Sequence, residues 1–184
     1  MLNFLASFPL LGKNKGPAIE LCLMYSIRLE NEFIKNLSSE GKSWLARAVV
    51  NMINIDGKLD PNEMPYMHDA VLLVNENERG ELLEHAKQRK FMELPNLKDD
   101  RKHAAEFLYY FASIIAADDR INIAEAEFFK VLCAKLGFPD FAARDVLKWT
   151  QELVELHKTR IDFQKNLMSI KPVFRSVDPS IEVS

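Results

Sequence analysis

An ungapped internal repeat is the feature of this sequence that most limits how the chain can fold. The two copies are Val49–Asn75 (VVNMINIDGKLDPNEMPYMHDAVLLVN) and Ala112–Phe138 (ASIIAADDRINIAEAEFFKVLCAKLGF), and they align without a gap when Asp56 is placed on Asp118. In each copy, apolar residues recur at helical spacing on both sides of a short acidic turn. The chain is therefore predicted to contain two copies of one unit, a helix, an acidic turn and a second helix.

Composition and charge are those of an ordinary globular chain. The 184 residues are 48% hydrophobic and 28% charged, which suits one domain with a sizeable core. The net charge is −3 and the basic residues are scattered, so we expect no nucleic-acid partner. No apolar run approaches the ~20 residues that span a bilayer. Cys22 and Cys133 stand alone in apolar stretches, as reduced core cysteines of a cytoplasmic protein do.

Helical periodicity extends over most of the chain, and no stretch shows the period-two alternation of a β-strand. We therefore expect an all-α fold, a single compact bundle of about seven helices with two pseudo-symmetric halves. The bundle is predicted to span residues 17–158, with repeat halves at about 44–90 and 106–156. A first helix is expected over 17–37, and a break over 38–43 precedes the next helix at Trp44.

The two ends of the chain are predicted to lie outside the repeat. The last long helix should begin at Pro139-Asp140, and its expected core stripe is Ala142, Val146, Trp149, Leu153 and Leu156. Residues 159–184 form a C-terminal extension, part of which we expect to pack. Residues 1–16 are apolar and are predicted to be a strap across the bundle, or else a short segment that contacts a membrane surface or a partner.

Capping explains part of each acidic turn. Asp60-Pro61-Asn62-Glu63 is typical of a helix N-terminus, with Asp60 as the cap and Glu63 reaching back to it. Pro65 either distorts this first turn or delays the start of the helix. Asn122 and Glu125 are predicted to form the equivalent capping box in the second copy. None of these residues requires a ligand on this interpretation.

Capping does not explain Asp56 and Asp118. A carboxylate in the last turn of a helix meets the negative end of the helix dipole, at a cost of ~0.3–1 kcal/mol. Turn N–H groups, a basic partner or a cation could offset that cost. Calcium needs six to eight oxygens, so a metal site requires either that the two turns approach each other or that helix residues such as Asp119 and Glu127 contribute. Two hypotheses stay open: capping with solvated charge, or a divalent cation, calcium or zinc, held by Asp56, Asp60, Glu63, Asp118 and Glu125.

The sequence contains no catalytic signature. It lacks the GxSxG motif of a serine hydrolase, and neither cysteine has reactive neighbours. The four histidines are dispersed without metal-ligand spacing, although His68 lies near the first acidic turn. The aromatic residues of the second half occur at helical spacing and are expected in the core. We therefore expect no catalytic residue, and no cofactor other than the cation considered above.

The residues around the two turns resemble the TerB-like tellurite-resistance family. They are MINIDGKLDPNEMPYMHDAVLL in the first half and IIAADDRINIAEAEFFKVLCAKLG in the second, and the resemblance covers roughly Trp44 to Glu155. It implies a bacterial, all-helical domain with internal pseudo-symmetry. Members of the family are linked to tellurite and other chemical-stress resistance and to membrane-associated assemblies, and a related domain occurs in membrane-anchored DnaJ-type co-chaperones.

The same resemblance implies metal binding by acidic residues at the turns. Carried over by position, these residues are Asp56, Asp60, Glu63, Asp118 and Glu125. Our leading expectation is a non-catalytic cytoplasmic module that binds a protein partner, with or without a cation, in a bacterial stress response. Contact with a membrane through residues 1–16 would be peripheral. The alternative is a structural adaptor or homo-oligomer without metal, which a contiguous exposed apolar patch away from the turns would favour.

Overall fold

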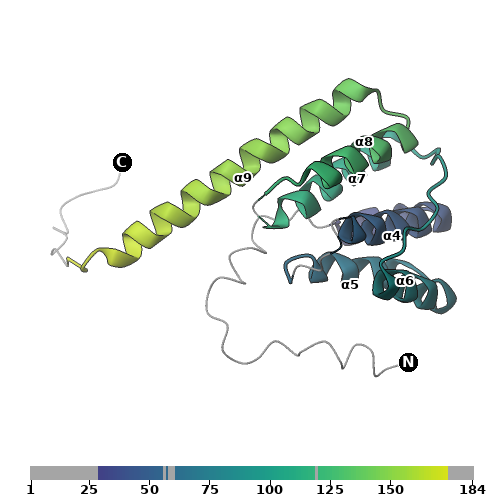
Figure 1. The fold of residues 1–184 in the computed structure, drawn as a ribbon, viewed down its shortest axis with the longest axis horizontal. Coiled ribbons are helices and arrows are strands. Elements are labelled where there is room, and N and C mark those ends of the chain that lie inside the picture. The colour runs from purple at the N-terminus through teal and green to yellow at the C-terminus, as the bar shows by residue number, and fades with distance from the viewer. Residues whose placement is uncertain (1–28, 56, 58–60, 119, 174–184) are drawn as a thin grey trace, which may run out of the picture.

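The computed structural model describes residues 29–55, 57, 61–118 and 120–173 of the chain (Figure 1). Within these ranges the fold is all-α, as predicted, and contains no strand. The described elements are α3 (Asn31–Asn36), α4 (Ser39–Asn54), α5 (Met64–Leu73), α6 (Glu76–Gln88), α7 (Arg101–Ile115), the 3-10 helix η1 (Ala116–Asp118), α8 (Ile123–Lys135) and α9 (Asp140–Ser169). The predicted strap over residues 1–16 and most of the predicted helix over 17–37 lie outside the described residues.

The boundaries of the helices follow the sequence repeat. Helices α4 and α7 begin at residues 39 and 101, and helices α5 and α8 end at residues 73 and 135, so both pairs are 62 residues apart. Ser38 and Asp100 cap the first helix of each half with their side chains, because each accepts a backbone N–H of the first turn. The two predicted halves are therefore present as two helix pairs, α4–α5 and α7–α8.

Burial follows the same repeat. The polar residues Asn51 and Ser113, which are 62 positions apart, are each only 2% exposed. Glu63 and Glu125 have the same separation and are each 6% exposed. Polar residues are costly to bury, so their recurrence at matching positions shows that the two halves are built to one plan.

Two helix starts differ from the prediction. Helix α4 begins at Ser39 rather than Trp44, because the Ser38 hydroxyl accepts the Gly41 N–H at 2.9 Å and starts the helix there. Helix α5 begins at Met64, so the delayed start was the correct alternative. Pro65 then lies in the first turn, where its missing N–H breaks no helical hydrogen bond.

The hydrophobic core lies around α4 and α7, the first helices of the two halves. Helix α4 contacts α5, α6, α7 and α8, and nearly all its residues from Trp44 onward are buried. The Trp44 ring stacks on Phe107 at 6.1 Å between centroids and meets Phe111 edge-on at 6.2 Å. Phe107, Tyr110, Phe111 and Phe129 are fully buried, as expected for an aromatic core, whereas Tyr109, which was also expected there, is 42% exposed.

The segment between α6 and α7 is held against this core. Met92, Leu94 and Leu97 are buried, although the segment has no regular structure. The Asn51 side chain donates to the Met92 carbonyl at 2.8 Å and accepts the Met92 N–H at 2.7 Å. The Asn51 side chain therefore pairs with both the N–H and the carbonyl of the buried Met92, as the backbone of a neighbouring β-strand would.

Helix α9 is much longer than its neighbours. It has 30 residues and a length of about 45 Å, and it contacts α7, α8 and η1. The residues that it buries lie between Ala143 and His157, mostly in its N-terminal half. Figure 1 shows the other half extending past the ends of α7 and α8. The helix is continuous through residues 158 and 159, where the sequence predicted an extension to begin. Among the described helices, none is long and apolar enough to cross a membrane.

The predicted core stripe of α9 is correct only in part. Val146 packs against the core, whereas the expected core residue Leu156 is 59% exposed. The side chains that α9 buries are Ala143, Thr150, Val154 and His157, which form a line turned around the helix from the predicted one. Trp149 keeps a partly buried place because its ring meets Tyr109 edge-on at 5.1 Å.

Candidate functional site

The structure describes only part of the predicted acidic site. Asp56 and Asp60 lie outside the described residues, and so does the side chain of Asp118, whose backbone ends η1. Glu63 and Glu125 are described, and both are buried. The hypothesis that the two turns together hold a cation therefore stays a prediction.

Glu125 is committed to the start of helix α8. Its Oε2 accepts the Asn122 backbone N–H at 3.1 Å, and the Asn122 side chain accepts the Ala124 N–H at 2.9 Å. This is the predicted capping box, and it satisfies backbone donors that the helix cannot satisfy itself. Any ligand at this turn would have to share a carboxylate that already has a structural role.

Glu63 lies at the start of helix α5. It is the N-cap residue, and its backbone carbonyl accepts the N–H groups of Tyr66 and Met67 at 3.0 and 3.1 Å. Helix α5 therefore starts three residues later than the capping pattern from Asp60 requires. The predicted contact of the Glu63 side chain with Asp60 involves a residue outside the described ranges and stays a prediction. The burial of Glu63 matches that of Glu125.

Metal-ligating side chains do not gather elsewhere in the described part of the chain. Among those residues, no group of three or more His, Cys, Asp and Glu side chains is arranged to hold a metal ion. His68 is exposed, whereas His157 is buried on α9. Burial of His157 was not predicted, because the histidines were expected on solvated helix faces.

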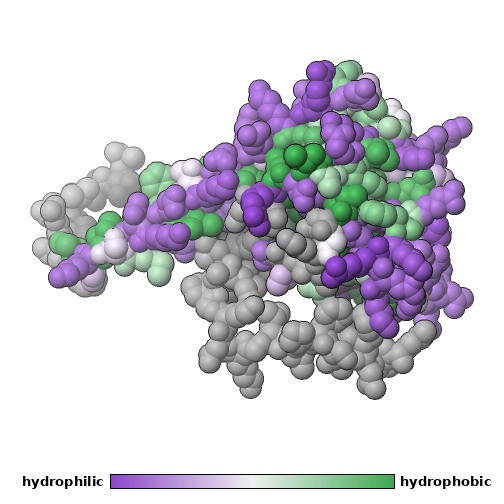
Figure 2. All heavy atoms as spheres, viewed as in Figure 1, coloured by the Kyte–Doolittle hydropathy of each residue, from purple (hydrophilic) through white to green (hydrophobic). Residues whose placement is uncertain are grey.

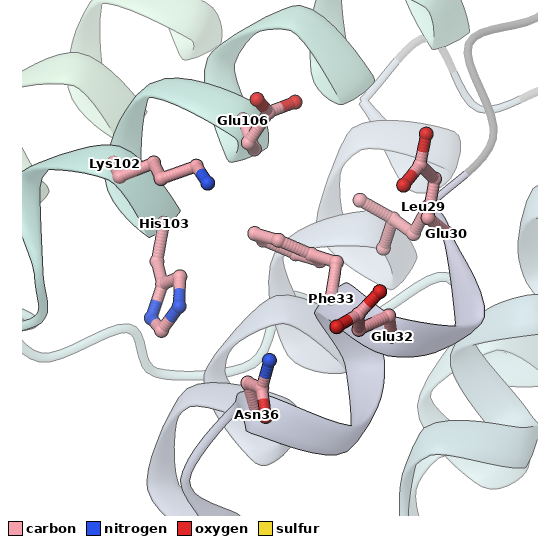
Figure 3. A pocket seen from close by; sticks show the side chains of 8 residues that line it. All are labelled: Leu29, Glu30, Glu32, Phe33, Asn36, Lys102, His103 and Glu106. Atoms are coloured by element: carbon pink, nitrogen blue, oxygen red, sulfur yellow. The ribbon is translucent and has the colours of Figure 1, made fainter.

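A recess lies between α3 and the start of α7 (Figure 3). Its volume is about 420 Å³, and its lining residues are Leu29, Glu30, Glu32, Phe33, Asn36, Lys102, His103 and Glu106. His103 Nδ1 lies 3.2 Å from an Asp99 carboxylate oxygen, and the His103 ring meets Phe33 edge-on at 5.3 Å. The lining contains no serine, threonine or cysteine that could act as a nucleophile.

Cys133 is an inert core residue. It is 1% exposed in α8, and burial raises the pKa of its thiol to about 12. The thiolate is the reactive form of cysteine, so this thiol does not act as a nucleophile or metal ligand near neutral pH. The prediction of a reduced core cysteine is confirmed for Cys133, while Cys22 lies outside the described residues.

The most distinctive surface is an apolar stripe on the projecting half of α9. We use "the stripe" for Leu156, Phe163, Leu167 and Ile170, which are 59%, 65%, 68% and 64% exposed. These residues share one side of the helix because they are separated by seven, four and three positions. Figure 2 shows green apolar residues between purple polar ones along this projecting part of the molecule.

The stripe was missed at the level of the sequence. An apolar helical stripe usually faces a core, so Leu156 was assigned to the bundle and part of the tail was expected to pack. The signal that could have revealed it is length. The apolar pattern of α9 continues for thirty residues, whereas the neighbouring helices α8 and α7 have thirteen and fifteen residues. The additional turns of α9 extend past these helices and have no bundle to pack against.

Comparison with known proteins yields no relative. No protein-family model matches the chain, and no curated protein and no solved structure matches it either. The TerB-like resemblance therefore stays a prediction from the two turn sequences.

Proposed function

We propose that this protein is a non-catalytic helical binding module that contacts a protein partner through the stripe on α9. The observation that carries the proposal is the exposure of four large apolar side chains on one side of a helix that extends beyond the bundle. Contiguous apolar patches are rare on soluble monomers and are typical of interaction sites. Helices commonly bind partners through apolar residues at this spacing.

The biological setting in this proposal comes from the family resemblance. A TerB-like module would act in the bacterial cytoplasm, in the response to tellurite or another chemical stress. An exposed stripe away from the acidic turns equally suits a structural adaptor, the alternative expected from the sequence.

Site-specific photocrosslinking in the cells that make the protein tests this proposal. A photoreactive benzoylphenylalanine replaces Phe163 in the stripe or, as a control, the exposed Asp162 on another side of the same helix. We expect an adduct of discrete mass from position 163 and none from position 162. The proposal fails if position 163 yields no protein adduct, or if both positions yield the same mixture.

A divalent cation at the acidic turns is a second proposal. The observation that favours it is the equal burial of Glu63 and Glu125 at matching positions of the two halves. Titration of the full chain with calcium or zinc, followed by calorimetry, would give saturable binding that weakens when Glu63 is replaced by Gln. If the titrations with both ions give only the heat of dilution, the proposal of a bound cation is wrong.

A further inference from the structure

We propose that the partner of the stripe is a second copy of this chain, with the projecting halves of two α9 helices paired antiparallel. This inference rests on the proposed function and adds the identity of the partner. Three features of the stripe support this inference. They are the spacing of its residues along α9, the charges of the residues beside it and its position on a side of the helix that faces away from the bundle.

The spacing is that of a coiled coil. The stripe extends toward the bundle through Arg160 and the partly buried Leu153. One side of α9 therefore carries Leu153, Leu156, Arg160, Phe163 and Leu167, and Ile170, the C-cap residue, follows them. Successive members are separated alternately by three and four residues. This is the heptad repeat that packs against a second helix of the same period in a left-handed supercoil.

The sequence of the stripe selects an antiparallel register. When Leu156 of one copy is level with Leu167 of the other, Leu153 meets Ile170, and Arg160 meets Phe163. Leu153, Leu156, Leu167 and Ile170 then face apolar residues, and the guanidinium group of each Arg160 lies near the Phe163 ring of the other copy. A parallel, in-register pair would instead place the two Arg160 charges opposite each other, which is unfavourable in a closely packed layer.

The residues beside the stripe fit the same register. Thr159 lies near Asn166 of the second copy, and His157 lies near Gln164, so no like charges meet along the edges. The charged residues Lys158, Asp162 and Lys165 are on the opposite side of α9 and stay in water.

The stripe is accessible to a second helix. It is turned roughly 130° around α9 from the buried line of Ala143, Thr150 and Val154, so a second helix can reach it without displacing α7 or α8. Pairing would bury roughly 1,000 Å² in total, the least that a specific interface needs. We therefore expect a reversible dimer with a dissociation constant of about micromolar order.

Sedimentation equilibrium of the full chain gives the first test. We expect a monomer–dimer equilibrium that L167E weakens at least about tenfold, because a charge would enter the paired layer opposite Leu156. The matched control is Q151E, which adds the same charge on the far side of α9 and should leave the equilibrium unchanged. A chain that stays monomeric at its highest soluble concentration overturns the inference.

Crosslinking then tests the register. Leu156→Cys and Leu167→Cys are made separately in a Cys22→Ser background, in which Cys133 is buried, and each chain carries a different tag. A short bis-maleimide should join the two chains when they are mixed, and should join neither chain to itself. Crosslinking of Leu156→Cys to itself overturns the antiparallel arrangement.

The outcomes also separate this inference from the proposed function. A monomer in sedimentation together with a cellular adduct to a different protein at position 163 overturns the second copy and supports the binding module. A monomer with no cellular adduct overturns both. A dimer with the mixed crosslink supports both.

Discussion

The Tyr66 hydroxyl donates a hydrogen bond to the Ser113 carbonyl at 3.1 Å and joins the second helix of the first half to the first helix of the second half. Both residues are buried. We predict that Tyr66→Phe destabilises the protein by about 1 kcal/mol, because it leaves a buried carbonyl with one partner fewer. Urea denaturation measures this change. Tyr109→Phe, at a half-exposed site, is the control, and an equal loss in both variants would contradict the assignment.

The link between Asn51 and Met92 should be the most sensitive polar contact in the core. Asn51→Leu keeps the volume of the side chain but leaves the Met92 N–H and carbonyl groups unpaired. We expect a loss of about 2–4 kcal/mol in the free energy of unfolding. Asn77→Ala, at an exposed position of α6, should change it by no more than about 0.5 kcal/mol. A loss at Asn51 as small as that at Asn77 would show that the contact has little weight.

One substitution should have opposite effects at two glycines. Gly137 has φ +71° and closes α8, with the Phe138 N–H bonded to the Cys133 carbonyl at 2.8 Å. Gly137→Ala should destabilise by about 1 kcal/mol, because alanine is strained in the left-handed region. Gly80 lies within α6 without positive φ, so Gly80→Ala should stabilise by about 0.5–1 kcal/mol. Thermal melting compares the two, and shifts of the same sign would contradict this account.

Burial of Cys133 predicts a decline in stability at alkaline pH. Below pH 9 the thiol is protonated in both states, so its contribution to stability is complete. Above its ordinary pKa of 9.0 the thiol ionises in the unfolded chain, while the folded chain keeps it neutral until pH approaches about 12, and stability falls across this interval. Unfolding of Cys22→Ser and Cys22→Ser/Cys133→Ala between pH 8 and 11 measures the difference. The Cys133 variant should show the shallower decline, and parallel profiles would refute the prediction.

The repeat explains why much of the fold was predictable from the sequence. Helical periodicity and glycine at Gly137 gave the elements around the second turn, and the constant offset gave the two-half plan. The start of α5 depended on whether Pro65 distorts or delays a helix, and sequence left both options open. The start of α4 was misplaced because Ser38 and Gly41 resemble a loop until the Ser38 cap is seen.

The candidate site was harder to predict, for a physical reason. Periodicity shows that one side of a helix is apolar, but it cannot show whether a neighbouring helix covers that side. Leu156 and Ala143 belong to the same helix, yet only tertiary packing decides that Ala143 is buried and Leu156 is exposed. The acidic turns drew attention because they recur, and the capping box accounts for Asn122 and Glu125 in the second of them.

The central claim is that the stripe serves binding and not folding, and two phenylalanines test it directly. Phe163 is 65% exposed on the projecting half of α9, whereas Phe129 is fully buried in α8. The measurement is the free energy of unfolding by Trp fluorescence at about 100 nM protein, roughly tenfold below a micromolar dissociation constant. We predict a change within about 0.5 kcal/mol for Phe163→Glu and a loss of about 3–5 kcal/mol for Phe129→Ala. A loss for Phe163→Glu as large as that for Phe129→Ala would show that the stripe is part of the fold, and would contradict the account.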